Sequence, residues 1–150
     1  MNKQKFNRSV DLYVVAVANL FNLIMVVIFY LRTRYINHPL VFGYVWAGLI
    51  IVLVTATVLN IRSKRIWWTI ALPLIFAVFL VFELILDYFL QYDFRSTSLL
   101  TPYLILYYVS ILGLIGYSFL TEKKLGTITL ATYFLSQIAA LYSYFNVGHG

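Results

Sequence analysis

The chain has 150 residues, of which 63% are hydrophobic and 11% are charged, and its net charge is +6. Soluble domains are usually about 45–50% apolar and about 25% charged, so this chain has too few charged side chains to cover a water-exposed surface. The composition argues against an ordinary soluble, disordered or nucleic-acid-binding protein. It indicates that a lipid bilayer is the main solvent of the chain.

The predicted elements are five helices. The chain contains five continuous apolar runs of about twenty residues, the length that crosses about 30 Å of hydrocarbon at about 1.5 Å per residue. A transmembrane barrel would alternate apolar and polar residues along each strand, and these runs do not. In chain order the runs cover residues 10–31, 40–61, 66–90, 99–120 and 125–145. The sequence therefore predicts a single all-α integral membrane domain, a bundle of five transmembrane helices.

The first run follows three basic residues, Lys3, Lys5 and Arg8, as the apolar segment of a secretory signal peptide would. Its hydrophobicity continues to Leu31, well beyond the length of a cleaved segment. We therefore expect this run to remain in the protein as the first membrane span.

The basic residues are unevenly divided between the two ends of the expected bundle. Five spans place the termini on opposite sides, and eight of the 11 Lys and Arg residues fall on the side of the N-terminus. Basic residues near short loops stay in the cytoplasm, so we expect the N-terminus inside and Gly150 outside. The expected location is the cell membrane, which in a prokaryote is the inner (cytoplasmic) membrane. Its anionic lipids are sufficient partners for the positive charge, without nucleic acid. The inner residues are Lys3, Lys5, Arg8, Arg62, Lys64, Arg65, Lys123 and Lys124, and the outer ones are Arg32, Arg34 and Arg95.

Two acidic residues, Glu83 and Asp87, lie within the third run. Ionisable residues inside a membrane are costly and usually point to function. A spacing of four residues places both carboxyl groups on one face of a helix, in the outer half of the membrane. Two carboxylates in a poor dielectric repel each other, and a proton or a bound cation relieves that repulsion. The structural alternative is that Glu83 bonds a tyrosine or an amide in the bundle while Asp87 reaches interfacial water.

Polar residues at helical spacing also mark the first, fourth and fifth runs. Such groups commonly form hydrogen bonds between helices, which is one interpretation of Asn19, Tyr107 and Gln137. The other interpretation is that these three residues form the wall of a wet cavity that opens outward beside Glu83. Ten of the 13 tyrosines and both histidines fall in the outer half of the expected bundle. An aromatic belt would be more symmetric, so this bias favours an outward-facing site.

No strong catalytic motif is present, and we expect no catalytic residue and no cofactor. The chain has no cysteine, which removes disulfides, thiolate catalysis and cysteine-bound metals. His38 precedes a proline in a loop and His149 is the penultimate residue, so neither belongs to a helical pair of metal ligands. We therefore expect no metal site.

Three functions are compatible with this pattern. The first is a small binding or transport protein, in which Glu83 and Asp87 bind a small cation, a proton or a polar solute, with Asn19, Tyr107 and Gln137 as the wall. The second is an accessory or assembly subunit, whose polar stripes face a membrane-protein partner or a second copy of the chain. The third, less favoured, is an outer-leaflet enzyme that modifies lipids, with Glu83 or Asp87 as the general base and Arg95 or Arg34 holding the phosphate.

Overall fold

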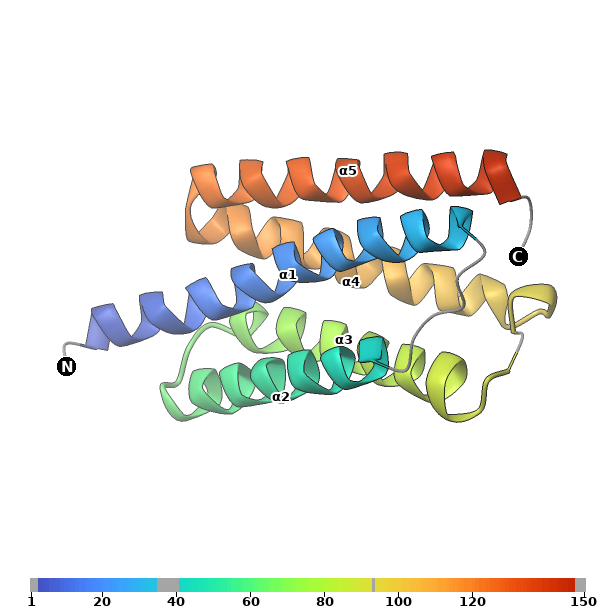
Figure 1. Cartoon of the computed structure of the whole chain (residues 1–150). Helices are drawn as coiled ribbons and strands as arrows, with labels where there is room; N and C mark the ends of the chain where they lie inside the picture. Colours follow the sequence, from blue (N-terminus) through green and yellow to red (C-terminus); the bar gives the residue numbers. More distant parts are fainter. Residues whose placement is uncertain (1–2, 35–40, 93, 148–150) are drawn as a thin grey trace.

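The structure is a computed structural model that describes residues 3–34, 41–92 and 94–147. Within these ranges the regular structure is entirely helical, and the prediction of five helices long and apolar enough to cross a membrane is confirmed. Lys3 at the start of the first helix and Val147 at the end of the last lie at opposite ends of the bundle (Figure 1). The helices are α1 (Lys3–Thr33), α2 (Val41–Arg62), α3 (Trp68–Glu83), η1 (Leu84–Phe89), η2 (Phe94–Ser96), α4 (Leu100–Thr121) and α5 (Lys123–Val147).

The helices differ from the apolar runs mainly at their ends. α1 starts at Lys3, seven residues before the first run, so its first two turns are polar. Helical hydrogen bonds continue where hydrophobicity stops, because an exposed polar turn satisfies its remaining backbone groups with water. α4 and α5 are separated only by Glu122, whose backbone is extended at φ −162° and ψ 132°.

The third run is not one regular α-helix. Its α-helical part ends at Glu83, and the six residues from Leu84 to Phe89 form a wider π-helical turn. In this turn the Leu90 N–H donates to the carbonyl of Ile85, five residues earlier, at 2.8 Å. Hydrophobicity alone predicts where a helix lies but not this change of hydrogen-bond register, and such turns often occur at functional sites.

Each helix packs against the next in the chain, α5 returns to α1, and α1 also contacts α4. Aromatic rings fill the middle of this arrangement. The ring of Phe21 on α1 lies 5.2 Å from that of Trp46 on α2, and 5.0 and 5.9 Å from those of Phe76 and Phe79 on α3. All four side chains are almost completely buried. These tilted and edge-on contacts hold three helices together around one apolar centre.

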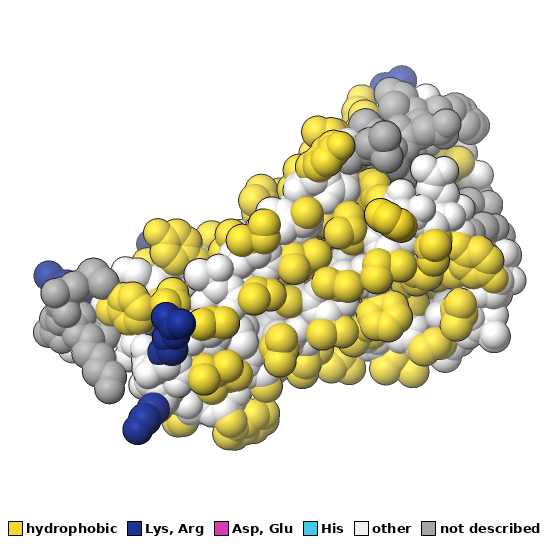
Figure 2. All heavy atoms as spheres, turned by 90° about the horizontal axis from the view of Figure 1, so that it is seen from below, with side chains coloured by type: hydrophobic (Ala, Val, Ile, Leu, Met, Phe, Trp, Pro, Cys, Tyr) yellow, Lys and Arg dark blue, Asp and Glu magenta, His cyan; other side chains and the backbone are white. Residues whose placement is uncertain are grey.

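The outer surface of the bundle is apolar over most of its length. On the face that lies below in Figure 1, hydrophobic side chains cover the middle, and Lys and Arg side chains appear at the two ends (Figure 2). Large exposed residues on α2 and α3 include Ile51, Val54, Leu74, Val78 and Phe82. A water-soluble monomer rarely exposes such a large continuous apolar surface.

Candidate functional site

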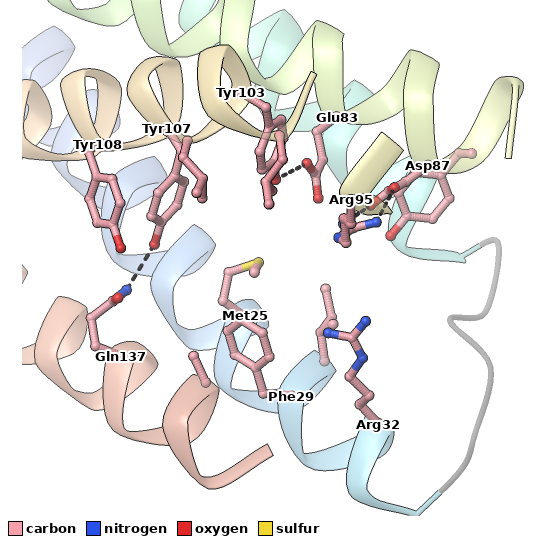
Figure 3. A pocket seen from close by; sticks show the side chains of 15 residues that line it. Met25, Phe29, Arg32, Glu83, Asp87, Arg95, Tyr103, Tyr107, Tyr108 and Gln137 are labelled. Atoms are coloured by element: carbon pink, nitrogen blue, oxygen red, sulfur yellow. Dashed lines mark hydrogen bonds and ion pairs between the residues drawn. The ribbon is translucent and has the colours of Figure 1, made fainter. Parts of the chain in front are cut away.

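A cavity of about 230 Å³ lies at the end of the bundle where α1, η1 and α5 end and α4 begins. Its lining comes from α1, α3, η1, η2, α4 and α5. Four charged side chains reach it, each from a different helical element, whereas the rest of the wall is mostly aromatic and aliphatic (Figure 3). The charged residues are Arg32, Glu83, Asp87 and Arg95.

Glu83 is the most deeply placed of these charged groups. It is the last residue of α3, and its residue surface is 6% exposed. The hydroxyl of Tyr103, on α4, donates a hydrogen bond of 2.5 Å to Glu83 Oε2. Tyr103 also packs its ring against Phe79 and Phe94. The carboxyl group is therefore fixed in the cavity wall by a tyrosine that is itself held by aromatic contacts.

Asp87 and Arg95 form a two-point ion pair beside Glu83. Arg95 Nη1 and Nη2 lie 2.8 and 2.7 Å from the two Asp87 carboxylate oxygens, the fork geometry that makes arginine–carboxylate pairs strong. The Arg95 guanidinium also lies 4.6 Å from the centre of the Phe94 ring. Burial lowers the pKa of Arg95, but its hydrogen bonds with Asp87 and the charge of that carboxylate outweigh this effect, so the pKa is raised. The Asp87 charge is therefore balanced within the cavity wall.

Local backbone geometry explains how Arg95 returns to Asp87. Gln91 adopts a left-handed conformation, with φ 48°, which ends the π-helical turn and reverses the chain. The short helix η2 then begins at Phe94, whose side chain is completely buried. Because Phe94 is anchored against Tyr103, its neighbour Arg95 lies over the end of η1.

The opposite end of the cavity is polar but uncharged. Gln137 Nε2, on α5, donates a hydrogen bond of 2.9 Å to the hydroxyl of Tyr107 on α4. Tyr108 lines the cavity next to them, and its ring contacts that of Tyr107 at 5.0 Å. Figure 3 shows these three side chains at one end of the cavity and the Asp87–Arg95 pair at the other. The cavity thus has a charged end and a hydrogen-bonding end joined by apolar walls.

Of the five predicted site residues, the structure brings four to this cavity: Glu83, Asp87, Tyr107 and Gln137. Asn19 lies elsewhere, between α1 and α5. Its amide donates to Thr129 Oγ1 at 3.0 Å and accepts from Thr132 Oγ1 at 2.9 Å. Asn22 adds a hydrogen bond to Thr132 at 3.1 Å. Asn19 therefore joins two helices, because α5 places its small hydroxyl residues opposite the α1 polar stripe.

The sequence predicts a contribution from the first run to the cavity but names Asn19, which is not one of the α1 residues that line it. Met25, Ile28, Phe29 and Arg32 all line it, and their spacing of three and four residues is that of one helical face. From the sequence alone, Arg32 is only one of the basic residues that set the orientation. Arg32 lies on the same helical face as the apolar residues Met25, Ile28 and Phe29. This shared face is the signal in the sequence that could have placed it at the cavity.

A second polar cluster, also not predicted, lies at the opposite end of the bundle. Arg65 donates to both carboxylate oxygens of Asp11, at 2.6 and 3.0 Å, and to Asn60 Oδ1 at 3.0 Å. The Tyr117 hydroxyl donates to the same Asp11 carboxylate at 2.5 Å. Lys64 has a left-handed backbone conformation, with φ 50°. It turns the chain so that the next residue, Arg65, reaches Asp11. The cluster joins α1, the α2–α3 connection and α4.

No group of three metal-binding side chains occurs in the part of the chain that the structure describes. His38, His149 and Gly150 lie outside the described residues. Comparisons of this chain with known protein families, with curated proteins and with solved structures find no match. The cavity itself is therefore the basis on which a function can be proposed.

Proposed function

We propose that this chain is an integral membrane protein that crosses the bilayer five times, with its N-terminus in the cytoplasm and its C-terminus outside. Five helices of sufficient length, an apolar outer surface and the excess of Lys and Arg at one end support this proposal. In this orientation the cavity lies in the outer half of the membrane and the Asp11–Arg65 cluster in the inner half.

The orientation is testable because the chain has no cysteine of its own. Lys64, in the α2–α3 connection, and Ser98, before α4, are both exposed. In intact cells a membrane-impermeant maleimide should label Ser98→Cys but not Lys64→Cys, and permeabilised cells should label both. Labelling of Lys64→Cys alone in intact cells would reverse the orientation.

We propose further that the cavity binds a small polar solute and uses Glu83 as its anionic group. The observation that carries this proposal is that the buried Glu83 carboxyl group lines a cavity, although it also accepts the tyrosine hydrogen bond that the structural alternative expects. Burying an ionisable group inside a membrane is costly, and such residues usually have a functional role. Asp87 contributes indirectly, because Arg95 already balances its charge.

The test is a thermal-shift screen of the purified protein in detergent with small cations, amines, amino acids and polyols. At least one solute should raise the Tm of the wild type and should fail to raise that of Glu83→Gln. Glu122→Gln is the matched control, since Glu122 lies in the α4–α5 connection, with its side chain 45% exposed. Equal shifts in wild type and Glu83→Gln, or no shift with any solute, would contradict the proposal.

The two alternative functions have less support. The polar stripes of α1 and α5 face each other, as the contacts of Asn19 with Thr129 and Thr132 indicate, so they do not need a partner helix. An enzyme that binds a lipid phosphate through Arg95 or Arg34 would need that arginine to be directed at it, but Arg95 is directed at Asp87 and Arg34 does not line the cavity. We therefore retain solute binding, or transport, as the proposed function.

A further inference from the structure

We propose that a groove between α1 and α2 binds one acyl chain of an anionic phospholipid of the inner leaflet, and that Arg62 binds the phosphate of this lipid at the end of the groove. This inference rests on the proposed membrane orientation but not on solute binding, because the groove and the Glu83 cavity share no lining residue. Its support is the apolar lining of the groove, its length, and the charge at its inner end.

The groove has a volume of about 250 Å³ and lies between two neighbouring helices of the bundle (Figure 1). Val10 and Tyr13 line it from α1, and α2 contributes residues from Ile51 to Leu59. Tyr13 and Ile51 are 63% and 66% exposed, so the groove opens on the outer surface. Apart from the hydroxyl groups of Tyr13 and Thr55, its lining side chains are hydrocarbon.

A lipid chain is the occupant that suits such a groove inside a bilayer. An empty groove would deprive its walls of van der Waals contacts, and water would find too few hydrogen-bond partners there. From Ile51 to Leu59 the groove follows eight residue steps of α2, or about 12 Å at about 1.5 Å per residue. This length is close to half of the roughly 30 Å hydrocarbon core, so it matches the chains of a single leaflet.

Arg62 continues the α2 side of the groove toward its inner end. It lies three residues after Leu59 and seven after Thr55, which places all three on one helical face. Helical side chains lean toward the N-terminus of their helix, so Arg62 leans toward Leu59. Arg62 is exposed, and it forms no ion pair with any residue that the structure describes. Its guanidinium can therefore donate to a phosphate in the fork geometry.

The charge of this end of the bundle favours an anionic headgroup. Eight of the 11 Lys and Arg residues belong to it, and basic residues at the cytoplasmic surface attract lipids with a net negative charge. A phosphatidylcholine headgroup carries an ammonium group that offsets its phosphate. Arg65 lies near the same end, but both of its terminal nitrogens donate to Asp11. Arg62 is therefore the arginine that is placed to bind the lipid.

The experiment uses phosphatidylglycerol with a photoreactive diazirine in the middle of one acyl chain as its probe. The purified full chain is placed in phosphatidylcholine nanodiscs that contain a small share of this probe, and the cross-linked residues are mapped by mass spectrometry after illumination. The adducts should concentrate on residues 10–13 and 51–59. Phosphatidylcholine with the same photoreactive chain should label these residues less.

Two variants test the two parts of the site. Thr55→Phe fills the groove and should remove most of the label from its walls, and Val52→Phe serves if that variant does not fold. The matched control is Val58→Phe, because Val58 is 40% exposed on the same helix but does not line the groove. Arg62→Gln should lower the phosphatidylglycerol label about fivefold. Its control is Lys124→Gln, an exposed basic residue at the same end of the bundle on α5, which should leave the label unchanged.

Several outcomes would overturn the inference. Adducts spread evenly over the lipid-facing surfaces, or equal labelling of all variants, would mean contact with bulk lipid only. Equal losses in Arg62→Gln and Lys124→Gln, or equal labelling by the two lipids, would refute a headgroup site at Arg62. Maleimide labelling that reverses the orientation would refute the inner-leaflet assignment. None of these labelling results affects the proposed solute binding, which the thermal shift of Glu83→Gln tests separately.

Discussion

The Arg65 guanidinium donates two hydrogen bonds to the Asp11 carboxylate across 54 positions of sequence. Their side chains are only 15% and 11% exposed. Asp87 and Arg95 form the same two-point pair at the other end of the bundle, but they are only eight positions apart. The first pair therefore joins distant helices, whereas the second closes a local turn beside the cavity.

Burial lowers the pKa of Arg65, but its hydrogen bonds with Asp11 and the charge of that carboxylate outweigh this effect and raise the pKa above its ordinary value. A raised folded-state pKa contributes stability that is fully present below the ordinary pKa of arginine and is lost only at higher pH. The ionisation of Arg65 therefore adds no pH dependence to stability near neutrality.

Asp11→Asn should destabilise the protein more than any surface charge change. The substitution leaves the Arg65 guanidinium buried without its ionic partner, a change that costs about 3–5 kcal/mol when a pair is fully buried. Because both side chains retain some exposure, we expect a loss near the lower end of this range. Thermal unfolding in detergent measures it.

The control for Asp11→Asn is Arg8→Gln at the same end of the bundle. Arg8 lies 3.4 Å from Glu122, with the two side chains 70% and 45% exposed, so its removal should change the free energy of unfolding by less than about 1 kcal/mol. Equal effects of the two substitutions would show that the Asp11–Arg65 pair adds no more than a surface contact.

Thr129→Val should weaken the contact between α1, α4 and α5. The Thr129 hydroxyl accepts from Asn19 at 3.0 Å and donates to Ser118 at 3.1 Å, and the residue is completely buried. Losing these contacts should cost about 1–2 kcal/mol. Thr127→Val removes an exposed hydroxyl that contacts only its own helix within the described hydrogen bonds, and it should have almost no effect. The Tm of Thr129→Val should therefore be lower than that of Thr127→Val, and equal Tm values would contradict the prediction.

Gly126→Ala should be destabilising because there is no room for a Cβ at this position. An added Cβ would clash with the ring of Phe119 and would lie 2.7 Å from its backbone Cα, so α4 and α5 would have to move apart near their connection. Overpacking of this kind costs about 1–3 kcal/mol. Gly116→Ala, where no atom lies within 4 Å of the added Cβ, should instead gain up to about 1 kcal/mol from helix propensity. Denaturant titration of both variants should therefore give opposite signs.

Gly43→Ala should reduce solute binding from a position outside the cavity. The added Cβ would lie 3.0 and 3.1 Å from two ring atoms of Tyr88, and Tyr88 lines the cavity. Displacing this ring should lower the affinity for the screened solute by about tenfold or less, since no polar partner is lost. Gly48→Ala on the same helix meets no atom within 4 Å and should bind as the wild type does. An unchanged affinity in Gly43→Ala would mean that the Tyr88 ring does not shape the binding surface.

Some features of the candidate site were predictable from the sequence. Glu83 and Asp87 stood out because charged residues are rare in apolar runs, and Tyr107 and Gln137 because they are polar at helical spacing. Asn19 had the same signal and yet lies between α1 and α5. A polar residue in an apolar helix must find a partner, but the sequence does not state on which neighbouring helix that partner lies.

The sequence by itself determined that the chain forms five long apolar helices, because the length and continuity of hydrophobic runs are properties of each segment alone. Only the tertiary structure decided which helices touch, that Arg65 reaches Asp11, that Arg32 joins the cavity and that the third helix widens after Glu83. These features depend on the relative rotation of the helices and on contacts across the bundle. Hydrophobicity along the chain carries no information on that rotation when nearly every face of a helix is apolar.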